Sequence, residues 1–215
     1  MSVPVFTDRR EAGRRLAAAL TDWADAPDRI VLALPRGGVP VAYEVAQALH
    51  APLDVLVVRK LGVPGREEYA MGAIASGGLC VLNDEVVQGL HIPAPALARV
   101  VAREEAELAR REQAYRGDRP PSVLGGRTVL LVDDGLATGA SMEVALQAVQ
   151  RQHPAQVVIA VPVAPADTCA RLRPLADALV CVATPDPFLA VGYWYRQFPQ
   201  TSDDEVRALL AAAPH

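Results

Sequence analysis

The sequence contains very little lysine, cysteine and histidine. Lys60 is the single lysine beside 20 arginines, and three cysteines and four histidines are scattered along the 215 residues. Their wide, irregular spacing excludes a disulfide framework and the compact Cys/His patterns of zinc sites. We therefore interpret the cysteines as small buried hydrophobic residues in a reducing compartment.

The sequence also lacks long apolar runs. The longest, around Val157–Pro165, is far shorter than the roughly 20 residues that a membrane-spanning helix needs. The first residues become charged without forming the apolar core of a signal peptide. Hydrophobic residues still make up 51% of the chain, enough for a sizeable core. These features predict a soluble, cytoplasmic protein with no membrane partner.

There is no basic excess. The 21 lysines and arginines are outnumbered by 25 aspartates and glutamates, for a formal net charge of −4. Dedicated nucleic-acid binders usually carry a basic excess, so this balance argues against a nucleic-acid partner. Arg99, Arg103 and Arg110 could still form a local basic face on one helix, although a solvated surface is the simpler interpretation.

Continuous apolar runs alternate with helical patterns along the chain. This alternation predicts an α/β fold in which a mostly parallel sheet is covered by helices on both faces. Buried strands are expected at Arg29–Leu34, Leu53–Val58, Arg127–Val132, Gln156–Val163 and Ala178–Ala183. Helices are expected at Asp8–Ala24, Val41–Leu49, Pro93–Arg116, Ala140–Gln152 and Pro165–Leu172, with a last one that begins at a Ser202–Glu205 capping box.

Between the second strand and the longest helix the pattern changes. Arg59–Glu68 is polar and contains glycine, and two short strand-like pieces follow at Ala70–Ala75 and Gly78–Leu82. We assign neither a helix nor a strand to the polar stretch. We expect one domain over residues 1–215, and its ligands should bind at the carboxyl ends of the parallel strands.

The strongest motif is the 13-residue segment VLLVDDGLATGAS, Val129–Ser141. A buried strand leads into two adjacent carboxylates, a loop of small residues and the start of a helix. Free N–H groups at a helix start favour a phosphate, and paired carboxylates can accept hydrogen bonds from a diol or bind a hydrated magnesium ion. The structural alternative is that Asp134 caps the helix and Gly139 only forms a turn.

This segment closely resembles the signature of the type I phosphoribosyltransferases, which bind 5-phosphoribosyl-1-pyrophosphate (PRPP). The resemblance implies that Asp133 and Asp134 contact the ribose hydroxyls and hold Mg²⁺ through water. It also implies a type I fold with a small hood, formed by residues 184–215 and the N-terminal helix. The loop that cradles the 5-phosphate would consist of Gly135, Leu136, Ala137, Thr138, Gly139, Ala140 and Ser141.

Two further strand ends carry basic residues. Arg36, Gly37 and Gly38 follow the first strand and are similar to the pyrophosphate loop of this family. Arg59 and Lys60, which we place at the end of the second strand, are similar to an R-K-x-G segment of adenine phosphoribosyltransferases that faces pyrophosphate. The resemblance implies a mobile lid next, here Arg66–Tyr69 with hinges at Gly62 and Gly65. A solvated strand end is the alternative for the basic pair.

Aromatic residues make up only 5% of the chain, yet five of them lie between Phe188 and Phe198. Such a cluster can stack on a planar base or simply close the sheet. It is similar to the F-V-V-G-Y hood of hypoxanthine-guanine phosphoribosyltransferases, with one extra residue after Phe188. By this resemblance the base would meet Phe188, Tyr193 and Asp186.

Two positions depart from the purine enzymes. Arg196 and Ala137 stand where those enzymes carry aspartates, although adenine enzymes also have alanine at the position of Ala137. The resemblance therefore implies PRPP binding and leaves the acceptor open.

The implied activity is Mg²⁺-dependent transfer of the 5-phosphoribosyl group from PRPP to a nitrogen acceptor, with a nucleobase as the expected class. Arg36, Lys60, Asp133 and Asp134 are the expected catalytic residues. The alternative is a PRPP-sensing regulator without catalysis. Whether the chain forms a homodimer is left open.

Overall fold

The computed structural model describes residues 5–214. Residues 1–4 and 215 lie outside this range. The expectation that the N-terminal segment is not a signal peptide therefore falls partly on residues that the structure does not describe. Within residues 5–214, no helix is both long and apolar enough to cross a membrane.

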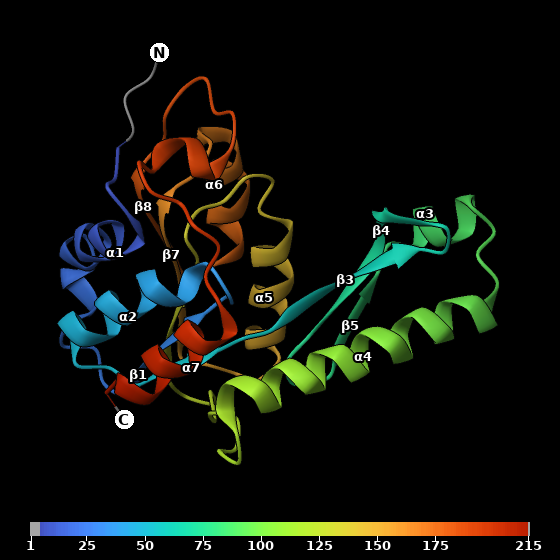
Figure 1. The fold of residues 1–215 in the computed structure, drawn as a ribbon, viewed down its shortest axis with the longest axis horizontal. Helices are drawn as coiled ribbons and strands as arrows, with labels where there is room; N and C mark the ends of the chain where they lie inside the picture. Colours follow the sequence, from blue (N-terminus) through green and yellow to red (C-terminus); the bar gives the residue numbers. More distant parts are fainter. Residues whose placement is uncertain (1–4, 215) are drawn as a thin grey trace.

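The core is the expected parallel sheet (Figure 1). Its strand order is β2-β1-β6-β7-β8, and all four neighbouring pairs are parallel. The continuous apolar runs form these strands because both faces of the sheet are buried. The strands are β1 (Arg29–Ala33), β2 (Leu53–Val55), β6 (Thr128–Val132), β7 (Gln156–Val163) and β8 (Ala178–Ala183).

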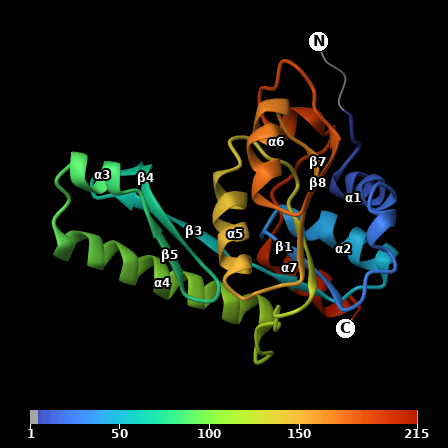
Figure 2. The same ribbon diagram turned by 180° about the vertical axis from the view of Figure 1, so that it is seen from behind.

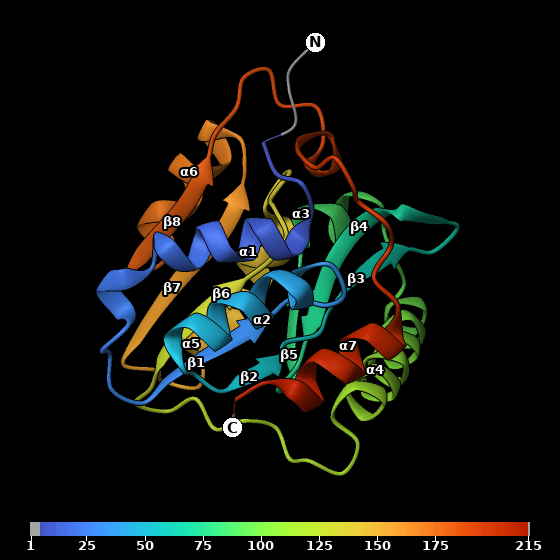
Figure 3. The same cartoon turned by 60° about the vertical axis from the view of Figure 1, so that its left-hand side comes forward.

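Helices cover both faces of the sheet, as expected (Figure 3). Val31 and Leu130 pack in the hydrophobic cluster of α1 (Arg9–Ala18) and α2 (Gly38–Leu49). Their neighbours along the strands point the other way, towards α5 (Ala140–Gln150) and α6 (Ala166–Leu172). This alternation follows from the two-residue period of a strand.

The first helix is shorter than expected. It begins after Asp8, whose Oδ1 accepts a hydrogen bond from the Glu11 amide at 2.8 Å, and ends at Ala18. A 3-10 turn, η1 (Thr21–Trp23), forms the rest of the expected helix.

A second, antiparallel sheet includes the polar stretch to which we assigned neither a helix nor a strand. β3 (Val58–Val63), β4 (Arg66–Ala75) and β5 (Leu79–Leu82) pair in the order β3-β4-β5. The second apolar run therefore divides, because β2 already ends at Val55 and β3 begins a new sheet. The expected lid Arg66–Tyr69 is the start of β4 rather than a loop, since its backbone pairs with β3 across a turn at Gly65.

This sheet forms an arm together with α3 (Asp84–Gly89), which we did not expect, and α4 (Ala94–Arg116) (Figures 1 and 2). The end of α4 is anchored to the core by a buried ion pair, in which Arg116 Nε donates to Asp54 Oδ1 of β2 at 2.8 Å. The same guanidinium donates to the Val55 carbonyl. Both partners are buried, so removing either one would leave an uncompensated charge where α4 meets the sheet.

After β8 the chain returns across the N-terminal segment. Phe6 forms a parallel bridge with Tyr195, and both are buried beside Trp194 in the 3-10 turn η3 (Val191–Trp194). The last helix, α7 (Asp203–Ala212), begins at Ser202, whose Oγ accepts from the Glu205 amide at 3.1 Å as the capping box predicts. The single-domain boundaries and the hood remain predictions.

The three cysteines are free thiols in different surroundings. Cys169 is buried and Cys181 is half-buried, but Cys80 is exposed. The expectation that all three are buried is therefore wrong for Cys80. Cys80 lies on β5, where the preceding residue Leu79 is buried and the Cys80 side chain points to the opposite face of the sheet.

Candidate functional site

The ends of β1 and β6 bring two predicted segments together. The strands are adjacent, with Ala33 level with Val132, so Gly37–Gly38 and Asp133–Asp134 follow at the same edge of the sheet. A Cβ atom on Gly38 would lie 2.9 Å from Asp133 Cα, and one on Gly37 would overlap the Asp134 carboxylate. Only glycines allow this approach. The peptide bond between Pro35 and Arg36 is cis.

The two carboxylates are largely buried and affect each other. Burial raises the pKa of Asp133 well above its ordinary value, and the neighbouring charge of Asp134 raises this pKa further. Burial also raises the pKa of Asp134, although the Arg9 guanidinium opposes that shift. The Asp134 amide donates to Asp133 Oδ1 at 2.8 Å and so holds the first carboxylate in place.

Arg9 is a site residue that sequence reasoning missed. Its Nε donates to Asp134 Oδ2 at 2.8 Å, from the first turn of α1. Nothing in the sequence distinguishes Arg9 from Arg10, Arg14 and Arg15 on the same helix. Its contact depends on how α1 packs against the edge of the sheet.

The predicted phosphate loop connects β6 to α5. Gly139, in the left-handed region with φ of 74°, precedes the first residue of α5. The Leu136 amide donates to the Val163 carbonyl at 2.9 Å, which fixes the loop to β7. The first amides of α5 have no partner within their own helix, so they can bind an anion.

The first turns of α6 hold this loop from outside. Thr168 Oγ1 donates to the Ala137 carbonyl at 2.8 Å, and Arg171 Nη2 donates to the Thr138 carbonyl. Arg171 also pairs with Glu143 of α5 at 2.7 Å. With these two carbonyls engaged, the loop can keep its amides directed to a ligand. Sequence reasoning missed both supports, because α6 carries no motif.

Arg36 lies at the same edge of the sheet but is already paired. Its Nη1 is 3.6 Å from Asp203 Oδ1 at the start of α7. Tyr115 of α4 donates to the same oxygen at 2.9 Å. Arg36 is about one third exposed, so a stronger anion can reach it.

The structure separates Arg59 from Lys60. Successive side chains of a strand point to opposite faces, and the Arg59 side chain points towards α4. There its Nε and Nη2 donate to Glu104 Oε2 at 3.0 and 2.5 Å. The pair lies within β3 rather than at the expected end of β2, so in this structure the two side chains do not face one place. That both bind the diphosphate stays a prediction.

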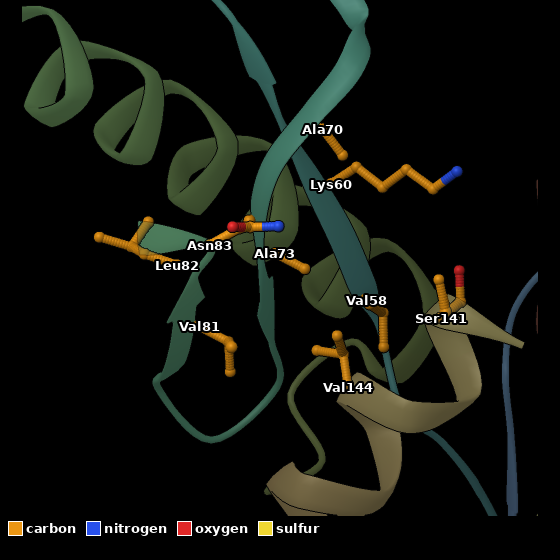
Figure 4. A pocket seen from close by; sticks show the side chains of 11 residues that line it. Val58, Lys60, Ala70, Ala73, Val81, Leu82, Asn83, Ser141 and Val144 are labelled. Carbon is orange, nitrogen blue, oxygen red and sulfur yellow. The ribbon is translucent and has the colours of Figure 1, made fainter. Parts of the chain in front are cut away.

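Lys60 instead lines a cavity of about 220 Å³ between the arm and the start of α5 (Figure 4). Ala140, Ser141 and Val144 of α5 form one wall of this cavity. Figure 4 shows the Lys60 chain extending towards the side on which Ser141 lies. An ammonium is thus available beside the predicted phosphate loop, while most other lining residues are apolar.

The predicted base residues do not all lie together. Asp186 and Phe188 line a cavity of about 570 Å³ that also contains Ala137 and Thr138 of the phosphate loop. The Phe188 ring packs on the Trp194 ring, with the two ring centroids 6.2 Å apart. Tyr193 is 63% exposed and does not line this cavity.

The acidic pair has suitable chemistry for Mg²⁺. Carboxylate oxygens are hard ligands, and Mg²⁺ often takes only one or two of them, completed by water and substrate phosphates. Within residues 5–214 there is no cluster of three or more potential metal-binding side chains. Two carboxylates would leave most of the coordination of such an ion to water and substrate oxygens.

Known proteins are similar to this chain in sequence or in fold. A Mycobacterium tuberculosis H37Rv protein, Rv0571c, named provisionally as a phosphoribosyl transferase, is 51% identical over 209 residues. The crystal structure of TT1426 from Thermus thermophilus is 44% identical with a TM-score of 0.83, covering 98% of this chain and 99% of that one. A Neisseria gonorrhoeae protein with bound ppGpp has the same fold at 16% identity, with a TM-score of 0.53 and 99% coverage of both chains.

The match to Rv0571c covers 97% of this chain but 47% of the relative, so the chain spans about half of that protein's length. Residues 7–193 match the phosphoribosyl transferase domain. The match includes the loop after β1, the acidic pair and the phosphate loop. The chain belongs to the phosphoribosyl transferase domain family.

Proposed function

We propose that the protein transfers the 5-phosphoribosyl group of PRPP to a nitrogen atom of a small acceptor, a nucleobase, and releases pyrophosphate in the presence of Mg²⁺. One observation carries the proposal: Gly37 and Gly38 lie directly against Asp133 and Asp134, whose chain continues into the anion-binding loop before α5. Membership in the phosphoribosyl transferase family supports the transferase class.

The phosphate loop binds the 5-phosphate of PRPP in this proposal. Amides from Ala137 to Ser141 donate to its oxygens, and the Thr138 and Ser141 hydroxyls add further donors. Thr168 and Arg171 keep the loop in shape from behind. The ribose hydroxyls then donate to the carboxylates of Asp133 and Asp134. Together these contacts orient C1 of the ribose for attack.

The diphosphate lies along the loop after β1. Its negative charge attracts Arg36, which exchanges Asp203 for the ligand, because a diphosphate carries more charge than one exposed carboxylate. Lys60 approaches from the arm. Asp133 and Asp134 would hold Mg²⁺, which when bound would supply positive charge that stabilises the leaving diphosphate.

Bond breaking and bond making occur at C1 of the ribose. The C1–O bond to the diphosphate breaks with its electron pair going to the leaving oxygen, and the lone pair of the acceptor nitrogen forms the new bond to C1. The proton that an N–H acceptor loses goes to solvent or to the released diphosphate. The positive character that the ribose gains is balanced by the nearby carboxylates. The acceptor occupies the cavity of Asp186 and Phe188, where an aromatic face is available for a planar base.

Pyrophosphate release tests the proposal. The protein is incubated with PRPP and Mg²⁺ and a panel of nucleobases and simple amines, and pyrophosphate is measured. The variant with both Asp133→Asn and Asp134→Asn is the control and should lose Mg²⁺-dependent PRPP binding by calorimetry. Binding of PRPP that is unchanged in this double variant contradicts the site.

A PRPP-sensing regulator is the second candidate. The observation that favours it is Ala137, which lines the acceptor cavity beside the phosphate loop and carries no group that could move a proton. The α4 arginines give little support to a regulator that binds nucleic acid. Arg103 pairs with Glu104 and Arg110 pairs with Glu107 on the same helix. PRPP binding without pyrophosphate release across the whole panel favours the regulator.

A further inference from the structure

Arg9 differs from the other arginines of α1. Its side chain is 11% exposed, whereas those of Arg10, Arg14 and Arg15 are 45–59% exposed. Its Nη1 donates to the Pro199 carbonyl at 2.7 Å, in addition to the bond from Nε to Asp134. Its guanidinium carbon lies 3.7 Å from the centroid of the Phe198 ring. Arg9 therefore joins α1, the acidic pair and the C-terminal segment.

Asp134 is fixed from three directions. Arg9 binds Oδ2, Gly37 lies against the carboxylate, and the Tyr195 hydroxyl donates to the Asp134 backbone carbonyl at 2.5 Å. Tyr195 also packs on Phe198, with ring centroids 4.9 Å apart. The orientation of this one carboxylate thus depends on three segments that are distant in sequence.

We infer that Arg9 is a positioning residue for PRPP, an inference that rests on the proposed function. Asp133 and Asp134 are neighbours in a largely buried site, so their negative charges repel each other. The cation of Arg9 offsets this repulsion and keeps Asp134 beside Asp133. It binds Oδ2 and leaves the approach to Oδ1 to a ribose hydroxyl. Arg9 itself does not touch PRPP; it acts through Asp134.

A purely structural role is the competing explanation. Arg9 could simply fasten α1 to Phe198 and Pro199 of the C-terminal segment. Its loss would then lower the stability of the protein and leave the affinity for PRPP unchanged. The two explanations differ in ligand affinity, and in whether the effect of Arg9 needs the Asp134 carboxylate.

Calorimetric titration of the intact protein with PRPP and Mg²⁺ measures this difference. We expect Arg9→Gln to weaken PRPP binding about tenfold or more, the usual effect of losing a hydrogen bond to a charged group. Arg9→Lys keeps the charge and should bind PRPP more tightly than Arg9→Gln. Arg10→Gln is the matched control and should bind normally, since Arg10 pairs with Glu44 at 3.0 Å, away from the acidic pair.

A double-mutant cycle identifies the route. If Arg9 acts through Asp134, then adding Arg9→Gln to Asp134→Asn weakens binding no further. Additive losses contradict the inference, as does wild-type affinity in Arg9→Gln with a lowered melting temperature. Should Arg9→Gln not fold, Arg9→Met decides, because it keeps an unbranched side chain against Phe198 and lacks the cation: weaker PRPP binding than wild type supports the inference and equal binding contradicts it. A wild-type protein that does not bind PRPP overturns the proposed function itself, and this inference with it.

Discussion

Gly37 lies directly against the carboxylate of Asp134, although one residue follows β1 and the other follows β6. A Cβ atom at position 37 would overlap Asp134 Oδ2 and would lie 2.8 Å from its Cγ. The loop after β1 and the acidic pair therefore form one continuous surface. A side chain at position 37 would have to move the carboxylate that we propose binds ribose.

Gly37→Ala tests this close packing. Overpacking of this kind costs about 1–3 kcal/mol, so we expect a lower melting temperature together with weaker PRPP binding. Gly89→Ala is the control, because a Cβ atom at Gly89 meets nothing within 4 Å. Normal PRPP affinity in Gly37→Ala would show that the position of Asp134 does not matter for binding.

We expect the ionised carboxylate of Asp133 to lower the stability of the fold while it serves PRPP binding. Its pKa is raised in the folded protein by burial and by the charge of Asp134. A carboxyl with a raised pKa contributes stability that is fully present below its unfolded pKa and is lost as pH rises through the folded pKa. Above the folded pKa the ionised carboxylate therefore destabilises the fold, and there Asp133→Asn should melt at a higher temperature than wild type.

Thermal melts at several pH values, without Mg²⁺ or PRPP, measure this effect. The difference between Asp133→Asn and wild type should shrink as pH falls and Asp133 becomes protonated. The variant should also lose PRPP binding. A constant difference in melting temperature at all pH values would show that ionisation of Asp133 is not the cause.

The sequence predicted the core well for a simple reason. The run Val129–Val132 is apolar throughout, a pattern typical of a strand that is buried on both faces. Strand β3 of the arm was not predicted, because it has one face towards α4 and the other towards a cavity and so lacks a continuous apolar run. Lys60, Gly62 and Gly65 made this segment polar and rich in glycine instead. The backbone of this segment forms a strand because it pairs with β4, and the local sequence pattern does not reveal that pairing.

The candidate site likewise contains residues that could be predicted from the sequence and residues that could not. The motif from Asp133 to Ser141 could be predicted because its residues are contiguous in sequence. Arg9 and Asp134 are 125 positions apart, and Thr168 reaches Ala137 from another helix, so no local spacing reveals either contact. Such residues become visible only when the packing of helices against the sheet is known.

Thr168→Val should weaken substrate binding without touching the substrate. The variant keeps the size of the side chain but loses the hydrogen bond to the Ala137 carbonyl, which is 2.8 Å long. We expect KM for PRPP to rise by about threefold to tenfold, in keeping with one lost hydrogen bond, and kcat to change less. Thr21→Val, on the exposed turn η1, is the control. An unchanged KM would show that α6 does not shape the phosphate loop.

Arg59 and Lys60 are adjacent residues with opposite expected effects. Lys60 is exposed in the cavity beside Ser141, so Lys60→Ala should leave the melting temperature unchanged and lower turnover by about tenfold or more, because it removes a cation from the leaving group. Arg59→Ala removes two hydrogen bonds from Glu104, which is 6% exposed, and should destabilise the fold by about 1–3 kcal/mol while turnover is largely kept.

Both variants are compared by thermal melting and by the release of pyrophosphate. Glu104 keeps a bond from Arg103 Nε at 3.0 Å in Arg59→Ala, so the variant should still fold. Because the two side chains lie on opposite faces of β3, we expect the loss of turnover in one variant and the loss of stability in the other. Equal losses of turnover in both variants would mean that Arg59 also reaches the diphosphate, and that the arm changes its position when PRPP binds.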